Sequence, residues 1–202
     1  MAGNVAPTQD LLIGAINGGS NVGGAQSQGL DDLAFYSGAL SAADASGLAS
    51  GALRPVDFNG PVQRYCSPAV PNSTGAPGTV DALGSLQAST NALTLEASSL
   101  PANAFGFFLT SQSQGQIAQP GGSQGVLCLG GGIGRYVGSG QIKNSGAGGA
   151  FQLALDLTQT PTPTGLVTVV AGDTWNFTAW HRDAVGGSVT SNFTDAVSIT
   201  FQ

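Results

Sequence analysis

The chain has 202 residues, enough for one or two domains, and 41% of them are hydrophobic, which suffices for a folded core. Only 8% are charged. Eleven acidic residues outnumber five basic ones, which are Arg54, Arg64, Arg135, Lys143 and Arg182. Because so few scattered cations cannot neutralise a row of phosphates, the composition argues against nucleic acid and against anionic membrane surfaces as partners. No apolar run reaches the ~20 residues of a membrane-spanning helix. A glycan or an uncharged cell-surface polymer fits this chain better.

The N-terminal part predicts two strands followed by a helix. Residues 11–15 are a short apolar strand candidate, residues 18–29 form a polar loop, and residues 30–36 predict a second strand. Ser41, with Asp44 three positions later, is typical of a helix N-terminus. The predicted helix is short, because a glycine-containing stretch at residues 48–51 ends it.

This order of elements resembles the C-terminal end of a laminin-G-like (concanavalin-type) jelly roll. In that family a strand of the pattern G-x-I-D-D/E-V-x-I-Y precedes A-L-S-x-x-E on a short helix. The matching segments are Gly29-Leu30-Asp31-Asp32-Leu33-Ala34-Phe35-Tyr36 and Ala39-Leu40-Ser41-Ala42-Ala43-Asp44. Asp44 stands where the family has glutamate. The resemblance implies that residues 1–51 are a truncated laminin-G-like tail, and that any ligand or calcium site of the complete domain cannot be carried over.

A truncated jelly roll would leave unpaired strand edges and an apolar face. We therefore expect residues 1–51 to dock on the rest of the chain, to self-associate with a second copy, or to stay unstructured. The first residues, Met1-Ala2-Gly3, lack the basic and apolar regions of a signal peptide. This suggests that the sequence begins inside that of a longer protein.

Residues 52–64, interrupted by Pro55 and Pro61, are interpreted as a linker or an entry strand. Residues 65–202 then form the second unit, in which short alternating segments are separated by turns rich in Gly, Pro, Asn and Ser. The fold class predicted is all-β: an antiparallel, jelly-roll-like β-sandwich, with one short helix near the N-terminus. The strands are expected at residues 80–87, 92–97, 104–110, 125–129, 134–138, 150–157, 165–170, 174–181 and 193–201.

The second unit also resembles a module found at the C-terminus of large secreted bacterial proteins. The family has no characterised role. Its resemblance implies a bacterial, secreted or cell-surface protein and adds no chemistry. The residues that carry it include Gly106-Phe107-Phe108, Cys128-Leu129-Gly130-Gly131, Ile133-Gly134-Arg135-Tyr136, Gly172-Asp173-Thr174-Trp175-Asn176-Phe177 and Ser191-Asn192-Phe193-Thr194-Asp195-Ala196.

Cys66 and Cys128 are the only cysteines, and His181 is the only histidine. One cysteine pair and one histidine cannot supply the four ligands of a structural zinc site. We expect a disulfide between the two cysteines, with two buried free thiols as the alternative. A structural disulfide would indicate an oxidising compartment, because such bonds are rare in the cytosol.

Two glycine-rich motifs suggest catalysis or phosphate binding. Residues 121–125 match the G-x-S-x-G pattern of serine hydrolases, in which Ser123 would be the nucleophile and His181 the base. Strand-like sequence follows, whereas that chemistry needs a helix, so the pattern is interpreted as a hairpin turn. Residues 129–135 lack the G-K-[ST] ending of a phosphate loop. They are interpreted as a loop or bulge that permits close backbone packing.

The most distinctive stretch runs from Trp175 to Asp183. On a strand, Trp175 and Phe177 would share the core-facing side, whereas Trp180 would point to the opposite side. Trp180 with Arg182 is the predicted ligand-binding pair, a stacking platform for a sugar ring. The alternative is a Trp180 covered by a neighbouring loop. His181 is interpreted as an ordinary side chain at a strand end.

No set of residues predicts a resident cofactor or a metal centre. Calcium needs six to eight oxygen ligands, and no D-x-D-x-D-G run supplies them, although scattered aspartates leave a structural calcium open. The leading hypothesis is a non-enzymatic secreted or cell-surface module that serves structure, adhesion or anchoring in a larger bacterial protein. The first alternative is a carbohydrate-binding module, with or without structural calcium. The second is a small secreted serine hydrolase that uses Ser123 and His181.

Overall fold

The computed structural model describes residues 62–202. The tail of residues 1–51, its helix and most of the predicted linker lie outside the described residues. Two short 3-10 turns occur at Ala88–Thr90 (η2) and Pro120–Gly122 (η3). The described strands are β1 (Val62–Tyr65), β2 (Thr79–Gly84), β3 (Leu93–Ser98), β4 (Phe105–Ser111), β5 (Ser113–Ala118), β6 (Val126–Gly130), β7 (Gly134–Arg135), β8 (Lys143–Asn144), β9 (Phe151–Ala154), β10 (Thr160–Thr162), β11 (Gly165–Val167), β12 (Thr174–Val185) and β13 (Ser188–Thr200).

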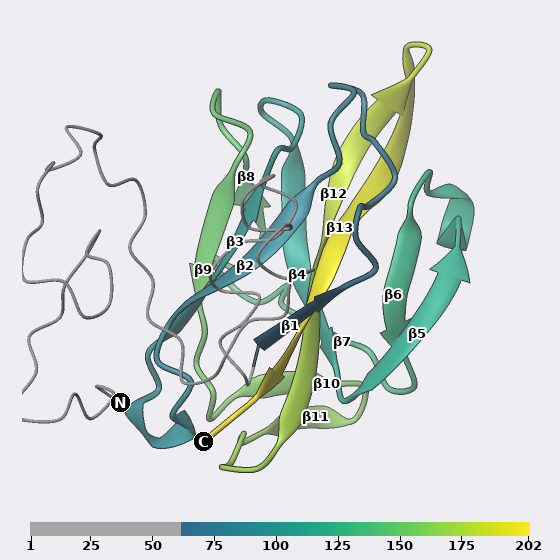
Figure 1. The fold of residues 1–202 in the computed structure, drawn as a ribbon. Helices are drawn as coiled ribbons and strands as arrows, with labels where there is room; N and C mark the ends of the chain where they lie inside the picture. The colour runs from purple at the N-terminus through teal and green to yellow at the C-terminus, as the bar shows by residue number, and fades with distance from the viewer. Residues whose placement is uncertain (1–61) are drawn as a thin grey trace, which may run out of the picture. The chain divides into compact units, whose positions relative to one another are not determined.

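The strands form two sheets and two separate hairpins, and all their pairings are antiparallel. The larger sheet has the order β1-β13-β12-β4-β7, with β8 also pairing with β4, and the smaller sheet has the order β2-β3-β9. In Figure 1 the smaller sheet lies on one side of the long β12–β13 pair, and the β5–β6 hairpin lies on the other. This arrangement confirms the predicted all-β antiparallel sandwich.

The main core lies between the two sheets. It combines Leu93, Leu95 and Ala97 of β3 with Trp175 and Phe177 of β12, all of them buried. The sequence predicts that Trp175 and Phe177 share the core-facing side of their strand, and their placement is confirmed. A second, smaller core lies between the larger sheet and the β5–β6 hairpin and is formed by Leu109, Leu127, Leu129 and Phe193.

A β-bulge midway along β13 reverses the side of the sheet to which its successive residues point. Thr178 of β12 pairs with Ala196, but Trp180, two residues on, pairs with Phe193, three residues back. One extra residue is thus accommodated in β13, which reverses the face of every residue beyond it. Phe193 therefore enters the second core, whereas Val197 enters the main core.

Thr194 and Asp195 occupy the bulge and replace the ladder bonds that it breaks. The Ala179 amide donates to the Thr194 hydroxyl at 2.9 Å, and the Asp195 amide donates to the Gly78 carbonyl at 3.1 Å. The Asp195 carboxylate, only 1% exposed, accepts a hydrogen bond from the Val80 amide at 2.8 Å. It also forms an ion pair with Arg64.

Arg64 extends this interaction to three strands. It lies on β1 and pairs with Asp81 of β2 as well as with Asp195 of β13. β2 belongs to the smaller sheet, and β1 and β13 to the larger one. The ion pairs therefore connect the two layers of the sandwich. Residues 62–64 of β1 fall inside the range interpreted as linker or entry strand, and the structure places them in the sheet.

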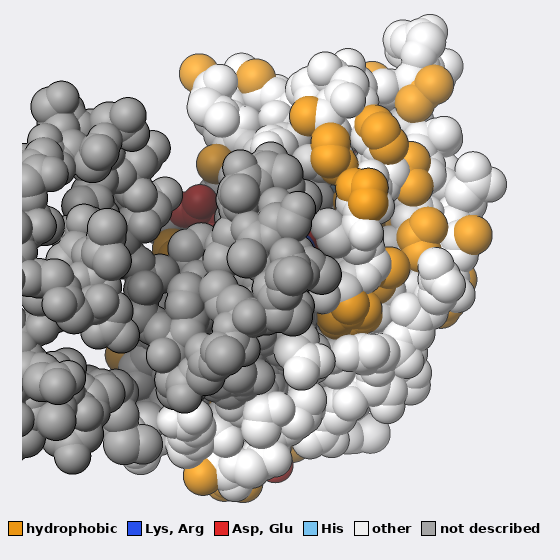
Figure 2. All heavy atoms as spheres, viewed as in Figure 1, with side chains coloured by type: hydrophobic (Ala, Val, Ile, Leu, Met, Phe, Trp, Pro, Cys, Tyr) orange, Lys and Arg blue, Asp and Glu red, His pale blue; other side chains and the backbone are white. Residues whose placement is uncertain are grey.

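The visible surface of the described residues carries few charged groups. Figure 2 shows mainly uncharged polar atoms, with hydrophobic side chains gathered over the part that includes the β1–β2 connection and the β5–β6 hairpin. Val70 in that connection and Ile117 in β5 are among the exposed hydrophobic residues. The sparse charge agrees with the composition of the whole chain.

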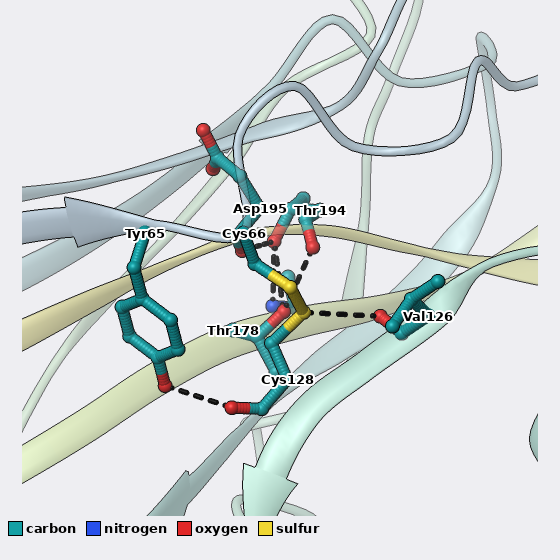
Figure 3. Close-up of a disulfide and its surroundings, with 8 residues drawn as sticks. Tyr65, Cys66, Val126, Cys128, Thr178, Thr194 and Asp195 are labelled. Carbon is teal, nitrogen blue, oxygen red and sulfur yellow. Dashed lines mark hydrogen bonds between the residues drawn. A yellow bond between two sulfur atoms is a disulfide. The ribbon is translucent and has the colours of Figure 1, made fainter. Parts of the chain in front are cut away.

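The predicted disulfide is present. Cys66 directly follows β1 and bonds to Cys128 of β6, with 6.3 Å between their Cα atoms. The neighbouring Tyr65 hydroxyl donates to the Cys128 carbonyl at 2.9 Å (Figure 3). The bond attaches the β5–β6 layer to the edge strand of the larger sheet. The two cysteines that it joins are 62 residues apart in the sequence.

Removing the Asp195 carboxylate should destabilise the described module strongly. We expect Asp195→Ala to lower the free energy of unfolding by about 3–5 kcal/mol, because it breaks a buried ion pair and leaves the Val80 amide without this acceptor. Urea denaturation monitored by tryptophan fluorescence measures the change. Asp156→Ala is the matched control, because Asp156 is exposed; its loss should cost no more than about 1 kcal/mol. Equal effects of the two variants would contradict a special role for Asp195.

Removing the disulfide should also destabilise the fold. For a separation of 62 residues, the Cys66→Ser/Cys128→Ser double variant should lose about 4 kcal/mol in the chain-entropy model. The reason is that the unfolded chain gains conformational freedom. Urea midpoints of the double variant and of the chemically reduced wild type should agree. A midpoint equal to that of the oxidised wild type would show that the bond adds no stability.

Candidate functional site

Trp180 lies on the face of the larger sheet that is turned away from the main core. It pairs with Phe107 of β4 on one side and with Phe193 of β13 on the other. The Phe107 and Trp180 rings pack with their centroids 5.0 Å apart and their planes tilted by 30°. Such an offset, tilted pair is a favourable aromatic geometry. The contact fixes the orientation of the indole ring.

Trp180 is partly covered and partly accessible. Trp180 and Phe107 are both partly buried, and they pack against the second core. The structure thus lies between the two sequence interpretations, the open stacking platform and the tryptophan covered by a loop. The part of the indole that stays accessible has its orientation set by the sheet below it. This is the arrangement that a rigid stacking surface requires.

Phe105 and Arg182 extend this surface along the strands. Phe105 precedes Phe107 by two residues on β4, so the two share a face, and the Phe105 side chain is 52% exposed. Arg182 follows Trp180 by two residues on β12 and is exposed. We call Phe105, Phe107, Trp180 and Arg182 the aromatic ledge. The prediction named Trp180 and Arg182 and missed both phenylalanines, which the alternating pattern Phe105-Gly106-Phe107 could have indicated.

The ledge carries a cation and no carboxylate of its own. Arg182 makes no ion pair with any residue of the described part of the chain, so its five N–H groups are free for a ligand. The adjacent Asp183 points to the opposite, core-facing side and is buried. The ledge can therefore offer a ligand aromatic ring faces together with the N–H donors of the Arg182 guanidinium group.

Ser123 and His181 are not joined by a hydrogen bond. The Ser123 hydroxyl donates to the Ser191 carbonyl at 2.9 Å and accepts from the Gly125 amide at 3.3 Å. The His181 ring has its Nδ1 atom 3.1 Å from the Arg182 carbonyl, while its Nε2 atom has no hydrogen-bond partner in residues 62–202. Both side chains are buried. These hydrogen bonds give the Ser123 side chain a structural role in the turn between β5 and β6.

The two glycine-rich motifs have the backbone roles predicted for them. Residues 121–125 lie in the turn between β5 and β6, and residues 129–135 run from the end of β6 through a loop into β7. Gly134 illustrates why glycine is needed, because a Cβ atom there would lie 1.8 Å from the Pro161 carbonyl oxygen. Close backbone packing therefore accounts for this motif.

His181 differs from its sequence interpretation. It is fully buried and lies inside β12, which continues to Val185, so it is not at the end of a strand. Burial lowers the pKa of His181 below its ordinary value, against the opposing effects of the Arg182 carbonyl and of Asp183.

Within residues 62–202, no three His, Cys, Asp or Glu side chains lie together in a group that could hold a metal ion. No helix in this part of the chain is long and apolar enough to cross a membrane. A hollow of about 560 Å³ in the described part of the chain is lined by uncharged side chains, among them Gln87, Leu157, Val169 and Gln202. It shares no lining residue with the aromatic ledge.

The chain was compared with protein-family models, with curated proteins and with solved structures, and none of the three comparisons finds a match. The laminin-G-like and secreted-module resemblances therefore stay predictions, and the candidate site is defined by its own geometry.

Proposed function

We propose that the chain is a non-enzymatic secreted or cell-surface module of a larger bacterial protein, and that it serves adhesion or anchoring through the aromatic ledge. The observation that carries this proposal is the ledge itself. It combines aromatic rings held on a rigid sheet with an arginine that has no ion pair in the described residues. Aromatic and arginine side chains are the residue types that supply most binding energy at recognition surfaces.

The disulfide supports the extracellular location. Structural disulfides persist in oxidising compartments, which include the bacterial periplasm and the cell exterior. The low charge of the chain supports an uncharged partner, because little electrostatic attraction is available to capture a polyanion. These two features agree with adhesion to a cell-surface polymer.

A carbohydrate is the partner that the ledge favours. A sugar ring has an apolar face that can lie on Trp180 or on Phe105, and its hydroxyl groups can accept hydrogen bonds from Arg182. A carbohydrate-binding module is therefore the second candidate function. It differs from the first in making sugar recognition the main task of the module.

The serine hydrolase alternative gains no support from the geometry. Its nucleophile would be Ser123, whose hydroxyl is engaged by the Ser191 carbonyl, and its base would be a fully buried His181. A nucleophile and its base must come within hydrogen-bond reach for proton transfer. Esterase turnover abolished by Ser123→Ala would nevertheless overturn the non-enzymatic proposal.

Replacing the ledge aromatics should remove glycan binding. On a glycan array that includes bacterial cell-wall polysaccharides, we expect Trp180→Ala and Phe105→Ala each to weaken binding about tenfold or more, which corresponds to about 1.4 kcal/mol. Leu166→Ala is the control, because Leu166 is 61% exposed and lies on β11, away from the ledge. Binding that survives both ledge substitutions, or that is lost equally in the control, would contradict the assignment.

A further inference from the structure

His181 is a buried titratable group that the proposed function does not use. It is the only histidine of the chain and is 0% exposed. It pairs with Gly106 of β4 and Asn192 of β13, which places it in the centre of the larger sheet. Its side chain shares a face with Ala179 and Asp183, the face that is turned toward the smaller sheet.

The imidazole ring is placed so that a second proton would have no acceptor. Nδ1 lies 3.1 Å from the Arg182 carbonyl, so in the neutral ring the Nδ1–H group donates to that oxygen. Nε2 then carries the lone pair and has no partner in residues 62–202. A methyl group on Gly78 would lie only 3.6 Å from Nε2. Gly78 therefore covers the ring.

Gly78 ends the β1–β2 connection, which we define as residues 66–78. A small set of bonds around His181 holds this connection on the β12–β13 pair. The Ser73 amide donates to the Asp183 carboxylate at 3.0 Å. The Asn192 side chain donates to the carbonyls of Val70 and Pro71 at 3.2 and 3.3 Å. The connection thus covers His181 and is hydrogen-bonded to both β12 and β13.

The charged groups that face His181 are few. On its own strand Asp183 lies two residues away, and its carboxylate is already engaged by the Ser73 and Ala184 amides and by Asn192. From β13 the facing side chains are those of Asn192 and Thr194, both uncharged. Gly78 of the connection and Leu100, which lies against Gly78, are uncharged as well. The Asp195 carboxylate is held by Arg64 and the Val80 amide.

We propose that His181 is an acid-sensitive latch: when its Nε2 atom takes up a proton, the β1–β2 connection is released from the sheet. The new N–H⁺ group would lie beside Gly78, where no acceptor in residues 62–202 is within hydrogen-bond distance. The one nearby anion, Asp183, can approach the imidazolium only by weakening its bond to Ser73. Both effects loosen the same segment of chain.

The direction of the pH dependence follows from burial. In the closed state desolvation holds the pKa of His181 below 6.5, whereas an opened or unfolded chain leaves it near that value. Well above pH 6.5 the ring is neutral in both states, and the closed form keeps its full stability. As the pH falls through 6.5 toward the lower pKa of the closed state, the open state binds the proton more readily. Acid therefore favours opening.

Hydrogen exchange followed by mass spectrometry tests this proposal. After correction for the intrinsic effect of pH, peptides covering residues 70–78 should exchange faster at pH 5 than at pH 7.5, by about twofold or more, because the open state binds the proton more readily. Peptides from β3 are the internal control and should not change. In His181→Gln, which is uncharged at both pH values, the acid effect should disappear. Acid-accelerated exchange that persists in His181→Gln would overturn the latch.

Nuclear magnetic resonance gives a test that does not depend on the folding of a variant. Because the chain has one histidine, its imidazole signal in the wild type needs no assignment. We expect this signal to titrate below pH 6.5, and the amides of residues 70–78 to shift with the same midpoint. Titration at or above pH 6.5, or a connection that does not respond, would contradict the proposal.

Discussion

The architecture depends on the bulge in β13 and on the buried carboxylate of Asp195 inside it. A bulge breaks regular ladder bonds, and the groups it frees must find other partners. The Thr194 hydroxyl is one such partner, because it accepts a hydrogen bond from the Ala179 amide. The Asp195 carboxylate accepts a hydrogen bond from the Val80 amide and forms an ion pair with Arg64. Because Arg64 also pairs with Asp81, the irregularity in one strand becomes the point at which both sheets meet.

The same bulge lets one strand serve two cores. Beyond it Val197 and Ile199 pack between the two sheets, while before it Phe193 packs under the β5–β6 hairpin. β12 runs alongside without a break, so His181 faces inward and Trp180 faces outward. The inner side places the histidine beneath the β1–β2 connection, and the outer side carries the aromatic ledge. Binding and acid response would then lie on opposite faces of one strand.

The regular parts of this fold could be predicted from the sequence, and the irregular parts could not. Strand alternation correctly places Trp175 and Phe177 in the main core, and the two cysteines correctly predict their bond. Pro55 and Pro61 make most of β1 resemble a linker or an entry strand, and β5 is not predicted because Gly115 and its neighbouring glutamines give no apolar pattern. The bulge depends on contacts between distant strands, so no local pattern reveals it. The strand predicted at residues 104–110 does not show how exposed Phe105 and Phe107 are, because exposure depends on which distant segments pack against that face.

The most direct test of this account asks which way β13 faces on each side of Thr194 and Asp195. Nuclear Overhauser contacts from the Phe193 ring and from the Val197 methyl groups answer it. The account predicts contacts from Phe193 to the methyl groups of Leu129 in the second core, and from Val197 to the Phe177 ring in the main core. If Phe193 and Val197 both contacted side chains of the main core, β13 would run without a bulge and the account would be wrong.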